Sequence, residues 1–242
     1  MRLTISNPGK RNALDHAILD GIAAALAGTD ARCVLLTGAA GMLSSGYDIA
    51  GLSARAAERL VAHPFATALE ALDAFERPVV AACGGHAIGG GLELALACDL
   101  RVAAEDARLG MPPAKLGLVY SHTGLRRFID AIGAPRTREL FLLGRPIDAW
   151  TALRWGLVNR VVDAGEVEDA ALELAVELAA NAPLSLTGNK RAIRAMLDAR
   201  WRADPSLEAE LIALREACFR SEDFAEGLRA FAEKRPPRWR GR

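Results

Sequence analysis

Two short glycine-bearing segments hold the residues whose types and spacing most favour chemistry. They are Ser44-Ser45-Gly46-Tyr47-Asp48-Ile49 and Ala87-Ile88-Gly89-Gly90-Gly91-Leu92-Glu93. The triple glycine is predicted to open a helix, where backbone N–H groups lack intrahelical acceptors and lie at the positive end of the helix dipole. Glycine also lets a carbonyl group approach the backbone without a Cβ in the way. With a second N–H from the Gly46-Tyr47 turn, the segments predict a two-donor oxyanion hole, in which one donor lowers a barrier by roughly 3–4 kcal/mol.

The residues around these glycines also bear on other interpretations of the two segments. A tight strand–helix turn without any ligand explains the triple glycine equally well. A phosphate site is disfavoured because no Walker Lys-Ser/Thr follows, and a dinucleotide site because the GxGxxG spacing with a later acid is absent. Glu93 lies on the first turn of the predicted helix, where a carboxylate suits the dipole without any catalytic role. Its functional interpretation is general acid–base catalysis beside the oxyanion hole.

The elements that must position these segments alternate between strands and helices. Strands are predicted over 2–6, 33–37, 79–83 and 100–103, and helices over 65–75, over 92–97 and after a cap at Asp15. This alternation predicts an α/β domain with parallel strand pairing. From about residue 134 the pattern is helical, over 138–143, 149–155 and 166–180, with 157–162 as the only strand-like run. We expect a core over 1–183 and a helical C-terminal region over 184–242 that packs on the core and on neighbouring subunits.

Composition narrows the class of protein. Of 242 residues, 51% are hydrophobic, which is enough for a sizeable core. Lys+Arg 30 against Asp+Glu 30 leaves no basic excess, so we expect no nucleic-acid partner. The four cysteines form no CxxC or CxxH pair, which disfavours a metal site and a disulfide, and Cys33, Cys83 and Cys98 are predicted to be buried thiols. No apolar run approaches the ~20 residues of a membrane span, and no signal-peptide pattern opens the sequence, so a cytoplasmic location is expected.

Several motifs together resemble the crotonase superfamily of enoyl-CoA hydratases and isomerases. Besides the two glycine segments they are Asn12-Ala13-Leu14, Leu-Leu-Thr-Gly at 35–38, Cys98-Asp99-Leu100-Arg101 and Glu233-Lys234-Arg235-Pro236. The resemblance covers essentially the whole chain. It implies an α/β spiral of ββα turns whose C-terminal helices form homotrimers or dimers of trimers. It also implies an acyl-CoA thioester as substrate, with no separate cofactor.

The resemblance also implies roles for individual residues. The thioester carbonyl would be held by the amides of Tyr47 and Gly90, and Glu93 matches the first catalytic glutamate of the family. Contacts to CoA are implied for Lys10, Arg11, Asp48 and Ile49, and for Lys234 toward the CoA of a neighbouring subunit.

The sequence departs from the hydratase pattern at Pro113. Hydratases of this family carry a second glutamate twenty residues after the first, and proline has neither a titratable group nor an N–H. Residues 116–120, Leu-Gly-Leu-Val-Tyr, resemble the methylmalonyl-CoA decarboxylase branch, in which a tyrosine at the position of Tyr120 lies in the active site. That branch tends to carry histidine where this chain has Tyr47. A core tyrosine with a satisfied hydroxyl is the alternative interpretation of Tyr120.

These observations predict an acyl-CoA lyase that stabilises a thioester enolate and decarboxylates a malonyl-type acyl-CoA. One alternative is an enoyl-CoA hydratase that uses Glu93 without the second glutamate. The other is a non-catalytic acyl-CoA-binding protein that keeps the oxyanion hole.

Overall fold

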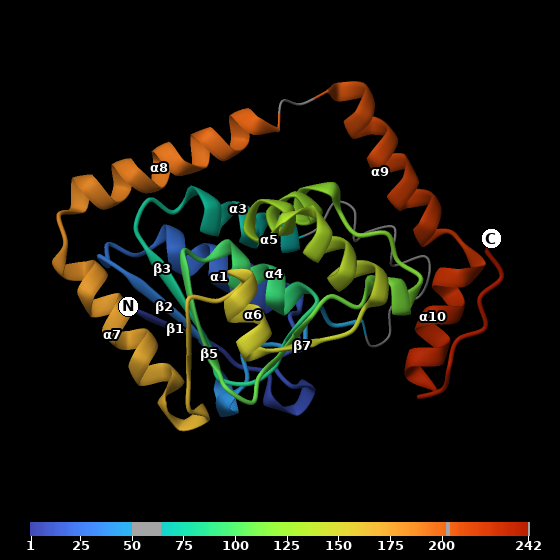
Figure 1. Cartoon of the computed structure of the whole chain (residues 1–242), viewed down its shortest axis with the longest axis horizontal. Coiled ribbons are helices and arrows are strands. Elements are labelled where there is room, and N and C mark those ends of the chain that lie inside the picture. The colour runs from blue at the N-terminus through green and yellow to red at the C-terminus, as the bar shows by residue number, and fades with distance from the viewer. Residues whose placement is uncertain (50–63, 202–203, 242) are drawn as a thin grey trace. The chain divides into compact units, whose positions relative to one another are not determined.

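The computed structural model describes residues 1–49, 64–201 and 204–241 of the chain (Figure 1). These residues form two compact units that interleave along the sequence. The first unit comprises residues 1–47, 64–110 and 146–201, and the second comprises 48–49, 111–145 and 204–241. The division of the chain after residue 183 stays a prediction.

The first unit is built on a five-stranded parallel sheet. Its strands are β1 (Arg2–Ile5), β2 (Val34–Gly38), β3 (Val79–Cys83), β5 (Leu100–Ala104) and β8 (Arg160–Val162), in the order β1-β2-β3-β5-β8. Every residue of β2 and β3 is buried, as expected for apolar strands of a parallel sheet that is covered on both faces. All neighbouring strands of this sheet pair in parallel, which confirms the pairing predicted from the sequence.

Helices pack against this sheet and against one another. Asp15 caps α1 (His16–Ala27) by accepting the Ile18 N–H at 2.9 Å, and α1 packs on α3 (Pro64–Ala74). α7 (Val167–Ala180) contacts β2, β3, β5 and β8, and Figure 1 shows it beside the strands. The remaining helices of this unit are α4 (Gly90–Ala97), α6 (Ala149–Trp155), α8 (Pro183–Arg200) and the 3-10 turns η1 (Pro8–Lys10), η2 (Ala39–Gly41) and η5 (Ala164–Glu166).

Buried thiols and one buried arginine mark the core of the sheet. Burial raises the pKa of Cys33 to about 11 and that of Cys83 to about 12, and it also raises the pKa of Cys98. The prediction that these three cysteines are buried is confirmed. Arg101 is 8% exposed and donates to the carbonyls of Cys98 and Leu157, so its guanidinium closes the turn after α4. Burial lowers the pKa of this guanidinium.

A second, three-stranded sheet in the first unit was not predicted. It consists of β4 (Ala87–Ile88), β6 (Arg108–Gly110) and β7 (Ile147–Asp148), with β6 pairing parallel to β4 and antiparallel to β7. The expectation that 157–162 is the only strand-like run after residue 134 was therefore wrong. Strands of two or three residues carry too little alternation to be recognised in a sequence.

The second unit is helical. It contains η4 (Pro113–Leu116), α5 (His122–Leu143), α9 (Pro205–Phe219) and α10 (Glu222–Ala232). Ser121, Asp204 and Ser221 cap the three α-helices through side-chain oxygens. The sequence predicted only 138–143 of α5, because Gly133 and Pro135 interrupt the pattern. Gly133 takes φ +75 and kinks the helix there. Among the described residues, no helix is both long enough and apolar enough to cross a membrane.

Candidate active site

The turn that ends at Tyr47 lies directly against the start of α4. Gly46 has φ +99, and a Cβ at this position would lie 2.6 Å from the Ile88 carbonyl oxygen and 3.3 Å from the Gly90 nitrogen. A Cβ on Gly90 would in turn lie 3.4 Å from the Tyr47 nitrogen. The two glycine segments that the sequence singled out are therefore neighbours, and the main-chain nitrogens of Tyr47 and Gly90 each lie within 3.4 Å of a Cβ position on the other segment.

Gly89 turns the chain from β4 into α4, so that the backbone N–H groups directly after it lie before the first hydrogen bond within the helix. It takes φ +56 and ψ −124, a conformation open essentially to glycine alone. Its own N–H donates to the Gly110 carbonyl at 2.8 Å, and its carbonyl accepts the N–H groups of Leu92 and Glu93. Leu92 is thus the first residue whose N–H is bonded within the helix, two residues past Gly90. The Gly90 N–H lies at the positive end of the helix dipole. This arrangement can donate to a developing oxyanion.

Ser44 joins the segments that hold this pair of amides, and the sequence analysis did not single it out. The buried hydroxyl donates to the Asn12 carbonyl at 2.7 Å and accepts the Gly46 N–H at 3.0 Å, while the Ser44 carbonyl accepts the Ile88 N–H at 3.2 Å. A Cβ on Gly91 would lie 2.6 Å from the Ser44 carbonyl oxygen, so helix and turn are in backbone contact. A serine two residues before the turn glycine, directly after the apolar pair Met42-Leu43, was the available signal.

Asn12 extends this buried network. It adopts a left-handed conformation with φ +54, and its side-chain amide donates to the carbonyls of Ala39 and Met42 at 2.8 and 2.6 Å. Its side-chain oxygen accepts the Asn7 N–H at 2.9 Å. Because each buried polar group of this network finds a partner, the 42–47 segment is held in one position.

Glu93 lies on the first turn of α4 and is only 1% exposed. It is three residues beyond Gly90, on the helix whose N-terminus supplies the candidate donor. A carboxyl in this setting can deliver a proton to a neighbouring carbon or take one from it.

The remaining predicted residues of the first unit flank the Tyr47 turn. Ser45 donates through its N–H to the Arg11 carbonyl at 3.0 Å and through its hydroxyl to the Lys10 carbonyl at 3.1 Å. The structure therefore places Lys10 and Arg11 beside the turn, and both are exposed. The Tyr47 hydroxyl is 3.0 Å from the His16 Nε2 atom, which ties the side chain of this turn to the start of α1.

The second unit contains the other predicted residues. Asp48 and Ile49 directly follow Tyr47 in the chain and are half-buried. Pro113 is buried and opens η4, and Tyr120 is half-buried with its ring packed edge-on against Phe141, centroids 5.4 Å apart. Lys234 is exposed just after α10, where it takes φ +52.

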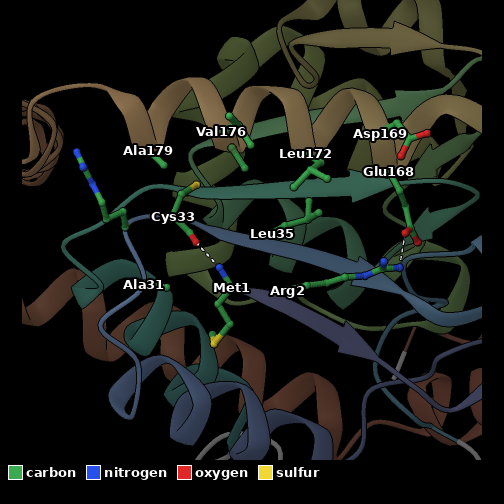
Figure 2. A pocket seen from close by; sticks show the side chains of 12 residues that line it. Met1, Arg2, Ala31, Cys33, Leu35, Glu168, Asp169, Leu172, Val176 and Ala179 are labelled. Atoms are coloured by element: carbon green, nitrogen blue, oxygen red, sulfur yellow. Dashed lines mark hydrogen bonds and ion pairs between the residues drawn. The ribbon is translucent and has the colours of Figure 1, made fainter.

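A separate cavity of about 420 Å³ lies in the first unit between α7 and the strands (Figure 2). Figure 2 shows Leu172 and Val176 of α7 facing Cys33 and Leu35, with Arg2 paired to Glu168 at one end. The residues that line this cavity include none of the candidate catalytic residues. Within the described part of the chain, no group of three or more histidine, cysteine or acidic side chains is placed to hold a metal ion.

Comparison with known proteins identifies the family of the chain. Residues 1–242 match the family model for enoyl-CoA hydratase/isomerase. The chain belongs to the enoyl-CoA hydratase/isomerase family. It is 34% identical to the 2,3-dehydroadipyl-CoA hydratase of Escherichia coli (strain K12), over 99% of this chain and 94% of that protein. A probable enoyl-CoA hydratase of Bacillus subtilis (strain 168) is 36% identical over the same shares.

Solved structures of the enoyl-CoA hydratase/isomerase family share the fold. Methylmalonyl-CoA decarboxylase in complex with 2-nitronate-propionyl-CoA matches with a TM-score of 0.91 and 29% identity, over 100% of this chain and 95% of that chain. An enoyl-CoA hydratase/isomerase from Pseudoalteromonas atlantica T6c matches with a TM-score of 0.83 and 31% identity, over 99% and 95%. The crotonase fold and the likeness to methylmalonyl-CoA decarboxylase, both predicted from the sequence, are confirmed, and the chain is an enzyme of the crotonase superfamily.

Proposed function

We propose that this enzyme is an acyl-CoA lyase that decarboxylates a malonyl-type thioester. The observation that carries the proposal is Pro113, a buried proline at the position where a two-carboxylate hydratase needs its second glutamate. The higher TM-score with methylmalonyl-CoA decarboxylase than with the Pseudoalteromonas hydratase/isomerase supports it. In this proposal the reaction needs an oxyanion hole and a proton donor, and it needs no second carboxylate.

The proposed step breaks the bond between the substrate's carboxylate and its α-carbon. The electron pair of that bond moves into the thioester to form an enolate, and CO2 leaves. The enolate oxygen accepts the N–H groups of Tyr47 and Gly90, each worth roughly 3–4 kcal/mol of barrier. The α-carbon then takes the proton of the buried Glu93 carboxyl, which solvent replaces in the next cycle.

Tyr120 orients the substrate's carboxylate in this proposal. A phenol stays neutral at pH 7, since its ordinary pKa is about 10, and it can donate a hydrogen bond to a carboxylate. A glutamate at position 113 would instead repel the substrate by about 4 kcal/mol at 4 Å and an effective dielectric constant of about 20. The packing of the Tyr120 ring against Phe141 limits the positions that its hydroxyl can take.

CoA binding and assembly complete the proposal. Lys10, Arg11, Asp48 and Ile49 contact the CoA, and Lys234 reaches the CoA of a neighbouring subunit. No described residue of α8 is buried, and its Leu184, Ile193 and Met196 are at least 60% exposed. Such an apolar surface on a helix supports burial against other copies, as a homotrimer or dimer of trimers. Light scattering after gel filtration measures this, and a monomer at micromolar concentration contradicts it.

Hydration of an enoyl-CoA is the second candidate function. The printed names of the relatives in Escherichia coli and Bacillus subtilis favour it, and a buried Glu93 beside the two amides supports it. Glu93 alone would then serve both proton transfers, as acid and as base in one turnover.

A mass-spectrometric turnover panel separates these functions. Purified enzyme is incubated in parallel with methylmalonyl-CoA, malonyl-CoA and crotonyl-CoA. We expect CO2 loss from a malonyl-type thioester, reduced in Tyr120→Phe, which keeps the ring against Phe141 and removes only the hydroxyl. Wild-type decarboxylation in a folded Tyr120→Phe contradicts the role of Tyr120.

A pair of variants tests Glu93. Glu93→Gln keeps the shape of the side chain and removes its proton, and it should lose most turnover of any thioester. Glu177→Gln, an exposed acid on α7 of the same unit, is the control and should keep wild-type turnover. Hydration of crotonyl-CoA alone, lost in Glu93→Gln, would establish the hydratase. Binding of acyl-CoA without turnover of any thioester would establish a non-catalytic protein.

A further inference from the structure

The turn that leads to Tyr120 is in backbone contact with α10. Gly117 ends η4 with φ +64, and a Cβ on it would lie 2.9 Å from the Asp223 carbonyl oxygen. A Cβ on Gly227, one turn further along α10, would lie 2.2 Å from the Leu116 carbonyl oxygen. Neither glycine leaves room for a side chain, so the turn cannot move without moving against this helix.

The end of α9 and a small apolar core close the turn from other directions. The Cys218 thiol donates to the Gly117 carbonyl at 2.9 Å. Phe219 and Phe224 pack edge-on with centroids 5.1 Å apart, and Leu118 packs against this pair. The residues just before Tyr120 are therefore enclosed by α9 and α10.

The segment after α10 also packs against the Gly117 turn. It turns back along α10 (Figure 1), and the Trp239 ring comes within 3.1 Å of the place that a Cβ on Gly117 would take. Trp239 is 44% exposed, so its own burial does not fix it in place. Two acids of α10 do so instead.

These two acids hold the chain on both sides of Trp239. Glu226 accepts the Arg238 N–H at 2.9 Å and pairs with the Arg235 guanidinium through both of its oxygens, at 2.6 and 3.1 Å. Asp223, one turn earlier on the same helix, accepts the Arg240 N–H at 2.6 Å and the Gly241 N–H at 2.8 Å. Hydrogen bonds to a charged acceptor are about twice as strong as neutral ones.

We infer that Glu226 is a positioning residue for Tyr120, acting through Trp239 and the Gly117 turn. Glu226 fixes the segment that carries Trp239, Trp239 supports Gly117, and the turn sets where Tyr120 begins. Selectivity for a substrate that bears a carboxylate therefore depends on an ion pair that touches no substrate atom. This inference rests on the proposed role of Tyr120 in decarboxylation.

Hydrogen exchange and turnover, measured on the same variants of the full chain, test the inference. Glu226→Gln and Trp239→Ala should each speed exchange of the Leu118 amide, which donates to Pro113 within the turn, by about tenfold. Both should lower kcat for methylmalonyl-CoA decarboxylation by a similar factor. Trp239→Phe should restore much of both. Glu216→Gln, which loses only an exposed ion pair with Arg220 on α9, is the matched control and should change neither.

The outcomes separate this inference from the proposed function. Unchanged exchange in both Glu226→Gln and Trp239→Ala, or an equal change in Glu216→Gln, overturns the support of the turn. Faster exchange with undiminished decarboxylation overturns the link to Tyr120. A wild-type enzyme that decarboxylates nothing refutes the proposed function, and exchange still decides whether Glu226 holds the turn. Should Glu226→Gln fail to fold, Trp239→Ala carries the same test.

Discussion

A methyl group on Gly91 tests whether the two glycine segments work as one unit. In Gly91→Ala the new Cβ would lie 2.6 Å from the Ser44 carbonyl oxygen and 2.8 Å from the Ser44 Cβ. Ordinary van der Waals contact begins near 3.4 Å, so the start of α4 and the turn must separate by about 0.8 Å. The atoms that collide are backbone atoms and a Cβ, which cannot swing aside as the end of a long side chain can.

This separation acts on the distance between the two candidate oxyanion donors. Gly90 immediately precedes the added methyl group, and Tyr47 lies three residues beyond Ser44. A misplacement of about 1 Å costs about 100-fold in rate, and the loss of one oxyanion donor costs about 100- to 1,000-fold in kcat. We expect kcat in Gly91→Ala to fall by about 100- to 1,000-fold on any thioester that the wild-type enzyme converts.

Gly21→Ala is the matched control for this measurement. Gly21 lies within α1, and a Cβ there would meet no atom within 4 Å. Alanine at a helical position stabilises by about 0.5–1 kcal/mol relative to glycine, so this variant should melt slightly higher and keep wild-type turnover. Initial rates by mass spectrometry and thermal melts by circular dichroism measure both variants. A folded Gly91→Ala with wild-type kcat would refute the reasoning that contact between these segments aligns the donors.

Three further predictions concern stability and reactivity. Arg101→Leu leaves two backbone carbonyls at 2.6 and 2.8 Å without their buried donor, and urea melts should show a loss of about 3 kcal/mol, whereas a loss near zero would contradict this role. The hydrogen bond from Arg235 lowers the pKa of Glu226 to about 2 from its ordinary 4.5. Wild type should therefore melt above Glu226→Gln by a constant margin at pH values above 4.5, and this margin should vanish as the pH falls toward 2. A margin that stays the same across this pH range would refute the stabilising role of the ionised carboxylate. A maleimide at pH 8 should label native enzyme only at Cys218, because this thiol is half-buried whereas the other three are buried, although burial raises the pKa of all four; four labels per native chain would disprove the burial of the other three.

The central strands and the glycine segments could be predicted because their signals are local. Runs of buried apolar residues specify β2 and β3, and Asp15 marks the start of α1 one residue before it begins. The pairing of the Tyr47 turn with Gly90 was also expected, because the resemblance to the crotonase superfamily implies that these two amides hold the thioester carbonyl.

Other features depend on contacts between residues that are distant in sequence. Ser44 gains its importance from Asn12 and Gly91, which lie on other segments. The beginning of α5 was missed because Gly133 and Pro135 are helix breakers, and only the folded chain shows that a kinked helix runs across them. The pairing of Glu226 with Arg235 requires the left-handed turn at Lys234, φ +52, which no local pattern indicated.

The candidate oxyanion donors are main-chain groups, and this has a consequence for how such an enzyme can be inherited and altered. Every amino acid except proline carries a backbone N–H, so few codon changes at positions 47 and 90 can delete a donor outright. In the proposed mechanism, positions 113 and 120 act through their side chains, and one codon change there can exchange a carboxylate for a proline or a phenol for a benzene ring. A descendant lineage could therefore acquire a new reaction while it keeps the machinery that stabilises the enolate. Each intermediate in such a lineage would retain the ability to stabilise an enolate.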